Sequence, residues 1–372
     1  MLWSDARESL LMAILLFDNS FIHLFDSSEE EIVMKNEPTD TGRPKYVPFA
    51  LTKDVVTEMF PVETEPKIPT MDKPLIIESA CPGWQLGEVR FPAVPIALKD
   101  QVKEQVDSLK AGAIIAHIHP RDPKTGLAQM NHELLAEVLD GIFSEFGDCV
   151  TFTDSLYPVL NAEVDCIIGT ERLLELGNGN KYVQGSLMVP IGHRRRGQPS
   201  YFSVRGAVEG VKWLEAHDVK PVYQLFDTNT HLGFRRHIFD KSVDNVKPRI
   251  MNIQLGKHDA HVSNQDPWSY LQLIANMNIV KANIPESIIG LYPGGRNWLP
   301  MVTMGIMAGV DIVRVGIEDC YWLYPHKDEI IKKNSDVVKM TVDIATILGR
   351  KVVRNADEAR KILGIKLTSK LH

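Results

Sequence analysis

Cysteine is scarce in this chain, and its spacing excludes two kinds of site. Only 4 of the 372 residues are cysteine, and none of them form a Cys-x-x-Cys pair: Cys81, Cys149, Cys166 and Cys320. A small disulfide-stapled domain would carry more cysteines, and a cysteine zinc knuckle would carry them in close pairs. We therefore expect a protein of a reducing compartment, namely the cytoplasm.

A long apolar run near the start and a dominant basic charge are also missing. The longest early run, Leu10–Phe17, follows Asp5 and Glu8 without a basic flank, so we expect neither a signal peptide nor a membrane span. The formal net charge is -7, and residues 1–72 alone hold 14 acidic against 6 basic residues. The remaining 34 acidic and 35 basic residues nearly balance. We predict that the protein binds neither nucleic acid nor membranes.

Residues 1–72, which carry the excess of acidic residues, differ in pattern from the rest of the chain. Residues 6–25 carry apolar side chains at helical spacing, and six prolines follow between Pro38 and Pro69. This pattern predicts a helix followed by an extended arm. We interpret residues 1–72 as an N-terminal extension that contributes to contacts between subunits, and residues 73–372 as the catalytic domain.

From Lys73 onward, apolar strand patterns alternate with helical ones. The expected strands are Pro74–Glu78, Ala113–Ile118, Val150–Thr153, Tyr182–Ser186, Lys220–Phe226, Arg249–Ile253, Ser287–Leu291 and Asp311–Val315. The expected helices are Ile96–Ala111, Asn131–Phe146, Ala162–Leu176, Ser203–His217, Asp266–Met277, Arg296–Ala308 and Val337–Leu348. Eight such strands predict a (β/α)8 TIM barrel. An open doubly wound sheet would need a Gly-x-Gly-x-x-Gly turn after the first strand, where Ser79–Trp84 stands instead.

The second expected strand ends in two histidines. His117 and His119 are two residues apart, so on a strand both imidazoles point to the same side. That arrangement suits a pair of metal ligands. The alternative is a polar strand end at which each histidine has its own partner.

The eighth expected strand runs into Arg314, Glu318 and Asp319. Closing a barrel brings the eighth strand beside the first, and the second strand is one further round, so Glu318 can reach both histidines. Two histidines, one carboxylate and an open fourth position are the usual ligands of a catalytic zinc ion. The alternative for Glu318 is a salt bridge to Arg314 or Arg121.

These two stretches resemble the β-keto acid cleavage enzyme family. The family runs Ala-Gly-Ala into His-x-His-x-Arg-Asp, as residues 111–122 do, and later Val-Arg-Val-Gly-Leu-Glu-Asp, as residues 313–319 do with one Ile for Leu. The segment from Val219 to Asp227 and the pair Gly295-Arg296 also fall in family order. The resemblance covers roughly residues 73–365 and leaves the extension outside.

The resemblance implies a zinc-dependent TIM barrel, commonly a homotetramer, that exchanges a β-keto acid with acetyl-CoA to give acetoacetate and a new acyl-CoA. It implies that His117, His119 and Glu318 bind zinc. It also implies that Asp319 and Arg314 promote proton removal and carbon–carbon cleavage. Physical chemistry agrees, because a metal ion can polarise the ketone and a nearby carboxylate can accept a proton. Alternatively, Asp319 only orients the zinc-binding histidines.

Three departures from the family pattern concern the substrate. Gln85 stands where the family has a glutamate, and Gln224 replaces a second glutamate that suits an amino group. The third loop holds Thr153 and Ser155 in place of a Ser-Thr-Gly-Gly turn, and either can supply the hydroxyl. We therefore expect the side chain of the substrate to be neutral, polar or anionic.

Two loops could bind anions. The basic run at residues 192–197 could meet CoA phosphates, or could be an exposed charged loop. Gly295 and Arg296 open the seventh helix, where free backbone N–H groups could receive a phosphate or carboxylate, although a Pro-Gly-Gly turn also serves chain geometry alone. His231, His237, His258 and His261 lack paired spacing and are interpreted as structural or surface residues.

The sequence thus predicts a zinc-dependent carbon–carbon cleaving acyltransferase that takes a β-keto acid and acetyl-CoA. One alternative is a zinc hydrolase or aldolase that works without CoA. Another is a degenerate relative that keeps zinc and only binds its ligand.

Overall fold

The computed structural model describes residues 65–83, 93–154, 167–192, 202–256 and 268–369. The expectations for the helix at residues 6–25, for Gln85, for Ser155 and for the basic run after Gly192 fall outside these ranges. Residues 67–372 group into one compact unit. The boundary expected between residues 72 and 73 stays a prediction.

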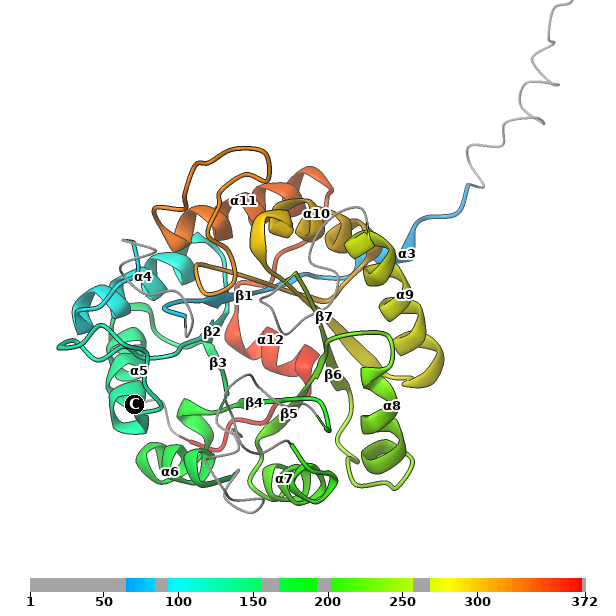
Figure 1. Ribbon diagram of the computed structural model, residues 1–372, viewed down its shortest axis with the longest axis horizontal. Helices are drawn as coiled ribbons and strands as arrows, with labels where there is room; N and C mark the ends of the chain where they lie inside the picture. Colours follow the sequence, from blue (N-terminus) through cyan, green and yellow to red (C-terminus); the bar gives the residue numbers. More distant parts are fainter. Residues whose placement is uncertain (1–64, 84–92, 155–166, 193–201, 257–267, 370–372) are drawn as a thin grey trace, which may run out of the picture. The chain divides into compact units, whose positions relative to one another are not determined.

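Eight parallel strands close into a barrel in chain order, and helices surround it (Figure 1). The strands are β1 Ile76–Ala80, β2 Ile115–His117, β3 Val150–Thr153, β4 Gly185–Met188, β5 Lys220–Leu225, β6 Arg249–Leu255, β7 Ser287–Pro293 and β8 Ile312–Val315. Strand β8 pairs with β1, which completes the circle. The predicted TIM barrel is confirmed.

Most helices follow the strands on the outside of the barrel. The helices are α3 Pro69–Asp72, α4 Leu98–Ala111, α5 His132–Phe146, α6 Ile168–Gly177, α7 Val204–Ala216, α8 Thr230–Phe234, α9 Trp268–Asn283, α10 Trp298–Ala308, α11 Asn334–Ile347 and α12 Ala356–Leu363, with short turns η3 Asn180–Tyr182, η4 Arg235–Phe239 and η5 Gly295–Asn297. Of these, α3 precedes β1 and α12 is the last described helix. Side-chain caps start several of them. The Asn131 side chain accepts the N–H of Leu134 before α5, and Asn355 accepts that of Glu358 before α12. None of the described helices is long and apolar enough to cross a membrane.

Strand alternation divides the side chains into an inner and an outer set. Ile76, Ile115, Val150, Val222 and Ile312 pack with one another inside the barrel, whereas their chain neighbours pack against the surrounding helices. Both faces of every strand are therefore covered, which agrees with the buried Ile and Val residues that β1, β2, β3 and β8 carry at their amino ends.

The inner side chains stack in layers of four from alternate strands. His117 pairs with Phe152 on β3, which pairs with Gly185 on β4, and the tilt of the strands places Leu187, two residues further along β4, at the height of His117. The same step, repeated twice, leads to Asn252 on β6 and to Arg314 on β8, and a last step returns to His117. We call His117, Leu187, Asn252 and Arg314 the His117 layer. It lies above the apolar layers, toward the carboxyl ends of the strands.

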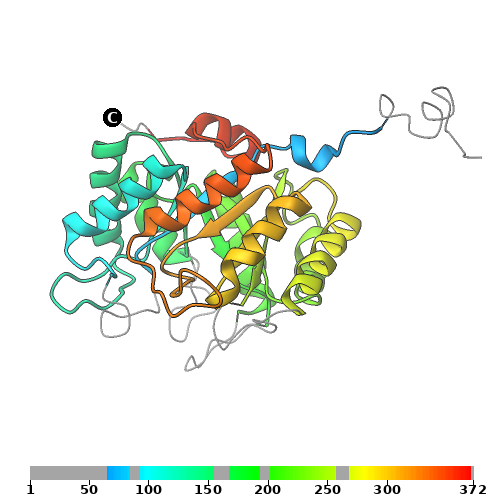
Figure 2. The same cartoon turned by 90° about the horizontal axis from the view of Figure 1, so that it is seen from above.

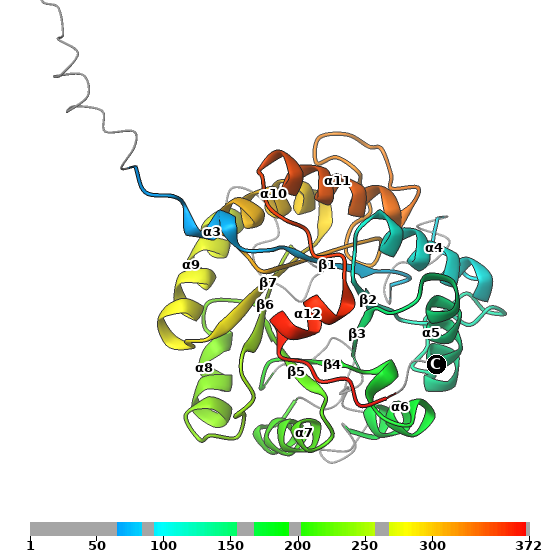
Figure 3. The ribbon, with the colours of Figure 1, turned by 180° about the vertical axis from the view of Figure 1, so that it is seen from behind.

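Helix α12 closes the opposite, amino-terminal end of the barrel. Figure 3 shows it in front of the strands, and the side view of Figure 2 places it at one end of them. Its Ala356, Ala359 and Leu363 pack on the inner residues near the strand starts. Arg360 anchors the helix by ion-pairing with Asp148. The open end of the barrel is therefore the carboxyl-terminal one.

Strand β4 differs from the sequence prediction. The strand expected at Tyr182–Ser186 begins at Gly185, because Asn180–Tyr182 form the turn η3. The Asn180 side chain holds that turn by donating to the carbonyls of Asp218 and Lys366. Helix α12 is likewise absent from the prediction, since its eight residues follow α11 without an intervening strand.

The closing role of α12 predicts a local stability effect. Replacing the fully buried Leu363 by Ala should lower the free energy of unfolding by about 2–5 kcal/mol, because it leaves a cavity against the inner apolar residues. Urea denaturation measures this. Lys361→Ala on the exposed face of the same helix is the control, with an expected change within about 0.5 kcal/mol. Equal effects would contradict this role of the helix.

Candidate functional site

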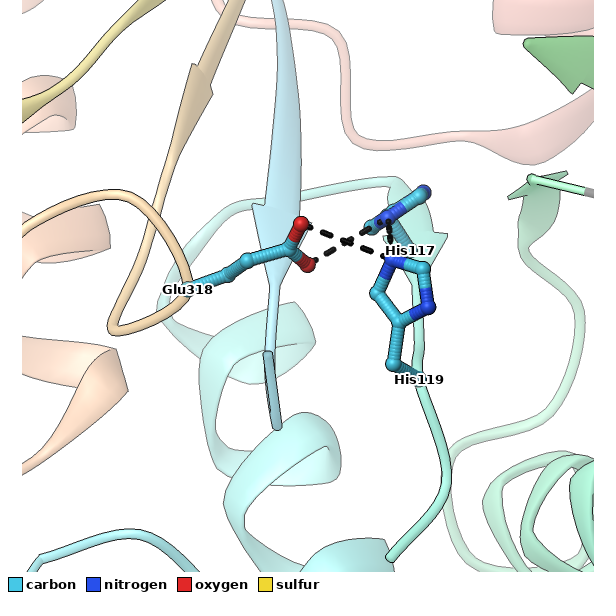
Figure 4. Close-up of side chains that lie close together, drawn as sticks. All are labelled: His117, His119 and Glu318. Carbon is cyan, nitrogen blue, oxygen red and sulfur yellow. Dashed lines mark hydrogen bonds and ion pairs between the residues drawn. The ribbon is translucent and has the colours of Figure 1, made fainter. Parts of the chain in front are cut away.

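Two imidazoles meet at the carboxyl end of β2. His117 Nε2 lies 3.1 Å from His119 Nε2, and the two ring planes are inclined at 74°. Figure 4 shows both rings turned toward the same point. Both side chains are buried. The convergence predicted from their spacing is therefore present.

Glu318 approaches both histidines from the loop after β8. Its Oε2 lies 3.3 Å from His117 Nε2, and its Oε1 lies 3.5 Å from His119 Nε2 (Figure 4). One ligand atom from each of the three buried residues lies within 4.8 Å of the others. Strand closure thus brings Glu318 to the histidines, as expected.

The three residues fit a zinc ion in spacing and in protonation. Two ligands of one tetrahedral zinc, each about 2.0–2.1 Å from it, lie roughly 3.3–3.4 Å apart, close to the separations found here. His117 Nδ1 lies 3.1 Å from the carbonyl oxygen of Phe152, which can only accept, so Nδ1 carries the proton. The lone pair of His117 is then on Nε2, the atom that faces His119 and Glu318.

Arg314 occupies the centre of the surrounding charges. Its Nε lies 2.7 Å from Asp319 Oδ2 and its Nη2 lies 2.6 Å from Glu318 Oε1. Its Nη1 lies 3.5 Å from Glu78 Oε1 on β1. The alternative salt bridge from Glu318 to Arg314 therefore exists together with the approach of Glu318 to the histidines. Arg121 donates to the carbonyls of Gly126 and Gly83.

Burial and charge shift the pKa values of this cluster. Burial raises the pKa of Glu78 to about 7, against the opposing effects of Arg314 and Tyr292. Burial, and then the positive charge of Arg314, lower the pKa of His117. Burial opposes the charge of Arg314, but its carboxylate neighbours outweigh this and hold its pKa above the usual range. Three carboxyl groups surround one guanidinium, so the net charge of this cluster is negative, and a bound divalent cation would offset it.

Two site neighbours escaped the sequence prediction. Asp154 Oδ2 lies 3.4 Å from His119 Nε2, although the family pattern pointed only to Thr153 and Ser155 in that loop. Glu78 accepts a hydrogen bond from the Tyr292 hydroxyl and lies 4.0 Å from His117 Nδ1. A lone acid within an apolar strand was the available signal for Glu78, because a buried charge needs a partner.

The substrate residues expected from the sequence lie at several places. Gln224 is buried on β5 and accepts a hydrogen bond from Gln254 of β6. Arg296 ion-pairs with Asp328, and its guanidinium lies 3.9 Å from the ring centre of Trp322. Gln85 and Ser155 lie outside the described residues.

The turn before α10 does not offer the free N–H groups that were expected at its glycines. The N–H of Gly294 donates to the carbonyl of Leu255, and that of Gly295 donates to the carbonyl of Asp319. Gly295 therefore holds the backbone of Asp319 in place. Its φ of 71° is in the left-handed region, where glycine is favoured.

A buried polar network supports the loop that carries Glu318. Asn334, at the start of α11, accepts the N–H of Ile317 at 2.8 Å and donates to the hydroxyls of Ser79 and Ser108. Gly83 packs on the other side, where a Cβ would collide with the Cα of Glu318. Both contacts restrict where Glu318 can lie.

The histidine interpreted as structural on α8 has a local partner. His231 Nδ1 lies 2.8 Å from the carbonyl oxygen of Thr228 in the preceding turn. His258 and His261 lie outside the described residues.

Comparison with known proteins identifies relatives of almost the whole barrel. The family model described as beta-keto acid cleavage enzyme matches residues 74–365. A 3-dehydrocarnitine:acetyl-CoA trimethylamine transferase of Rhizobium meliloti (strain 1021) is 24% identical over 81% of this chain and 99% of its own length. A 3-keto-5-aminohexanoate cleavage enzyme of Acetoanaerobium sticklandii is 27% identical over 78% of this chain and 98% of its own length.

A solved structure agrees with the fold. The binary complex of ObcA with oxaloacetate superposes with a TM-score of 0.58 at 14% identity, covering 74% of this chain and 68% of that one. At this identity the likeness concerns the barrel architecture alone.

The network around Asn334 predicts a measurable loss of stability. Asn334→Leu leaves the Ile317 N–H without its acceptor. The hydroxyls of Ser79 and Ser108 each lose one hydrogen bond but keep their own acceptors, Gln105 and the Glu104 carbonyl. The free energy of unfolding should therefore fall by about 1–3 kcal/mol, the cost of one buried group left unpaired. Urea denaturation provides the value. Lys339→Ala removes an exposed ion pair on the same helix and should change it by less than about 1 kcal/mol. An Asn334→Leu protein as stable as the control would show that the network is dispensable.

Proposed function

The chain belongs to the beta-keto acid cleavage enzyme family, and from that premise we propose that it exchanges acyl groups between a β-keto acid and acetyl-CoA at a zinc site. The products are acetoacetate and a new acyl-CoA. One observation carries the proposal: the buried triangle of His117, His119 and Glu318 lies directly beside the ion pair of Arg314 and Asp319. Both groups lie at the carboxyl ends of barrel strands, where TIM-barrel enzymes have their active sites.

The relatives support the two substrates separately. The Rhizobium meliloti relative is named as a transferase that uses acetyl-CoA, and the Acetoanaerobium sticklandii relative is named for cleaving a 3-keto acid. Each matches over nearly its full length. We infer that the present chain combines a keto acid and acetyl-CoA in the same way.

Zinc is proposed to be held by His117 Nε2, His119 Nε2 and a carboxylate oxygen of Glu318. When bound there, zinc supplies a Lewis acid that favours negative charge on the ketone oxygen of the substrate. The hydrogen bond from His117 Nδ1 to Phe152 sets the ring orientation. Arg314 holds Glu318 from the other side at 2.6 Å.

Asp319 is proposed as the proton acceptor. The guanidinium of Arg314 holds both of its carboxylate oxygens, at 2.7 Å and 3.2 Å, which fixes the direction of the carboxylate. The N–H of Gly295 fixes its backbone. A carboxylate oriented in this way can take a proton from C2 of the β-keto acid. The alternative, that Asp319 only orients the histidines, predicts a loss of zinc when Asp319 is changed.

The exchange balances without a further reactant. The bond between C2 and C3 of the β-keto acid breaks, and C2 forms a new bond to the acetyl carbon of acetyl-CoA. The sulfur of CoA loses its acetyl group and forms a new bond to C3, which is the carbonyl carbon of the acyl-CoA product. The proton that Asp319 accepts from C2 is returned to the same carbon in acetoacetate, so the carboxylate is regenerated.

Five further residues are proposed to bind the substrate. Gln85, Ser155, Gln224, Gly295 and Arg296 are proposed to line the substrate site. Gln224 is supported by its position above the apolar layers on β5. An amide in place of a glutamate favours a neutral, polar or anionic substrate side chain over a cationic one.

We further propose a homo-oligomeric, cytoplasmic enzyme that binds neither nucleic acid nor membranes. The described cysteines, Cys81, Cys149 and Cys320, are buried and are not joined in disulfides, which is typical of a reducing compartment.

Paired variants test the roles of the metal-binding residues and of Asp319. His117→Ala with His119→Ala should remove bound zinc, because one carboxylate is too few ligands. Asp319→Asn should retain zinc and lose about 100-fold or more in turnover, because an amide cannot accept the proton. Elemental analysis of the purified proteins and an acyl-CoA exchange assay provide the two values.

The same measurements separate the alternatives. Full zinc content in the double histidine variant would refute the proposed metal site. Zinc lost from Asp319→Asn would favour the orienting role of Asp319. Turnover of a β-keto acid without CoA would favour a hydrolase or aldolase, and zinc without any turnover would favour a binding protein.

A further inference from the structure

Asn252 is a buried amide in the interior of the barrel that lacks a hydrogen-bond partner. Its side chain is fully buried on β6, and neither Oδ1 nor Nδ2 has a partner among the described residues. Burying an amide without partners costs folding free energy, and an apolar residue of similar size would avoid that cost. The stability of the fold therefore does not explain why an asparagine stands at this position, whereas a functional role would.

The position of Asn252 relates it to the proposed metal site. It belongs to the His117 layer, together with Arg314, and it lies on β6, opposite β2 in the eight-stranded circle. Its amide therefore faces the same interior space as the histidine and the arginine.

The neighbouring strand makes room for this amide. Gly290 pairs with Asn252 across β6 and β7, and a Cβ at Gly290 would collide with the Oδ1 of Asn252. The amide thus occupies a space that any other residue at position 290 would fill. Two neighbouring strands are adapted to place one polar group in the barrel.

The wall around Asn252 is polar but uncharged. Gln254 Nε2 donates to Gln224 Oε1, which leaves the amide nitrogen of Gln224 and the carbonyl oxygen of Gln254 for other groups. Among the described residues of β4, β5 and β6 in the His117 layer and directly above it, Leu187, Asn252, Gln224 and Gln254 carry no charge. The charged groups of the site are Glu78 on β1, Arg314 on β8 with the two carboxylates of the loop that follows it, and Asp154 directly after β3.

Resting on the proposed function, we propose that Asn252 binds the acyl part of the β-keto acid and selects a neutral substituent that both donates and accepts hydrogen bonds, such as a hydroxyl group. A carboxamide has both N–H donors and an acceptor oxygen, so it can accept from a hydroxyl and donate to it at the same time. A cationic substituent would lack a carboxylate on this wall, and an anionic one would lack a basic group. This narrows the substrate class from neutral, polar or anionic to neutral and hydroxylated.

Three β-keto acids that differ only at C5 test the inference: 3-oxo-5-hydroxyhexanoate, 3-oxo-5-aminohexanoate and 3-oxohexanoate, each with acetyl-CoA. The zinc-loaded full chain should give the highest kcat/KM with the hydroxy compound. In Asn252→Leu, the ratio of kcat/KM for the hydroxy compound to that for 3-oxohexanoate should fall at least about tenfold, because a site built for a hydroxyl loses its partner. Asn252→Ala carries the same comparison if the leucine variant is unstable.

Asn276 provides a matched control. It is also a buried asparagine whose Nδ2 has no partner, but it lies on α9, outside the barrel strands. Asn276→Leu should leave the ratio between the substrates unchanged, and both leucine variants should melt at or above the wild-type temperature.

The outcomes separate the inference from the proposed function. A ratio unchanged by Asn252→Leu, an equal loss with all substrates, or a wild-type preference for the amino compound overturns the inference and leaves acyl exchange intact. If the wild type exchanges none of the three with acetyl-CoA, the proposed function fails, and the inference fails with it.

Discussion

The buried guanidinium of Arg314 is the interaction on which the site depends. It is 1% exposed and contacts the carboxyl groups of Asp319, Glu318 and Glu78, which belong to the loop after β8 and to β1. A charge this deep is tolerated only when it is well paired, so its partners have little freedom to move. The same contacts aim Glu318 at the histidines and turn Asp319 toward the interior. They also leave an excess of negative charge, which suits a divalent metal ion.

The rest of the barrel supports this arrangement from outside. The amino-terminal end is closed by α12, and the charged groups lie at the opposite, carboxyl-terminal end of the strands. Asn334 and Gly83 hold the Glu318 loop from two sides, and Gly295 holds the carbonyl of Asp319. Opposite the charges, β5 and β6 present carboxamides, of which Asn252 has no partner among the described residues. The site thus has charged groups on one side and carboxamides on the other.

Much of this could be predicted from residue order alone. Apolar runs of Ile and Val at regular spacing predict the barrel, and the two-residue spacing of His117 and His119 predicts their convergence. Barrel closure then predicts the approach of Glu318. Partners set by three-dimensional packing could not be predicted in this way. Asp154 and Glu78 approach the histidines through tertiary contacts, and Gly295 donates to a backbone atom on another strand's loop. The strand β4 was misplaced because the side-chain contacts of Asn180 make a turn from an apolar stretch.

The central claim is that His117, His119 and Glu318 together hold one zinc ion. A crystal of the full-length protein, measured on both sides of the zinc absorption edge, tests it most directly. We expect a single strong anomalous peak within about 2.0–2.2 Å of both Nε2 atoms and of one oxygen of Glu318. A zinc-loaded crystal without a peak between these three residues, or with zinc bound elsewhere in the barrel, would contradict it.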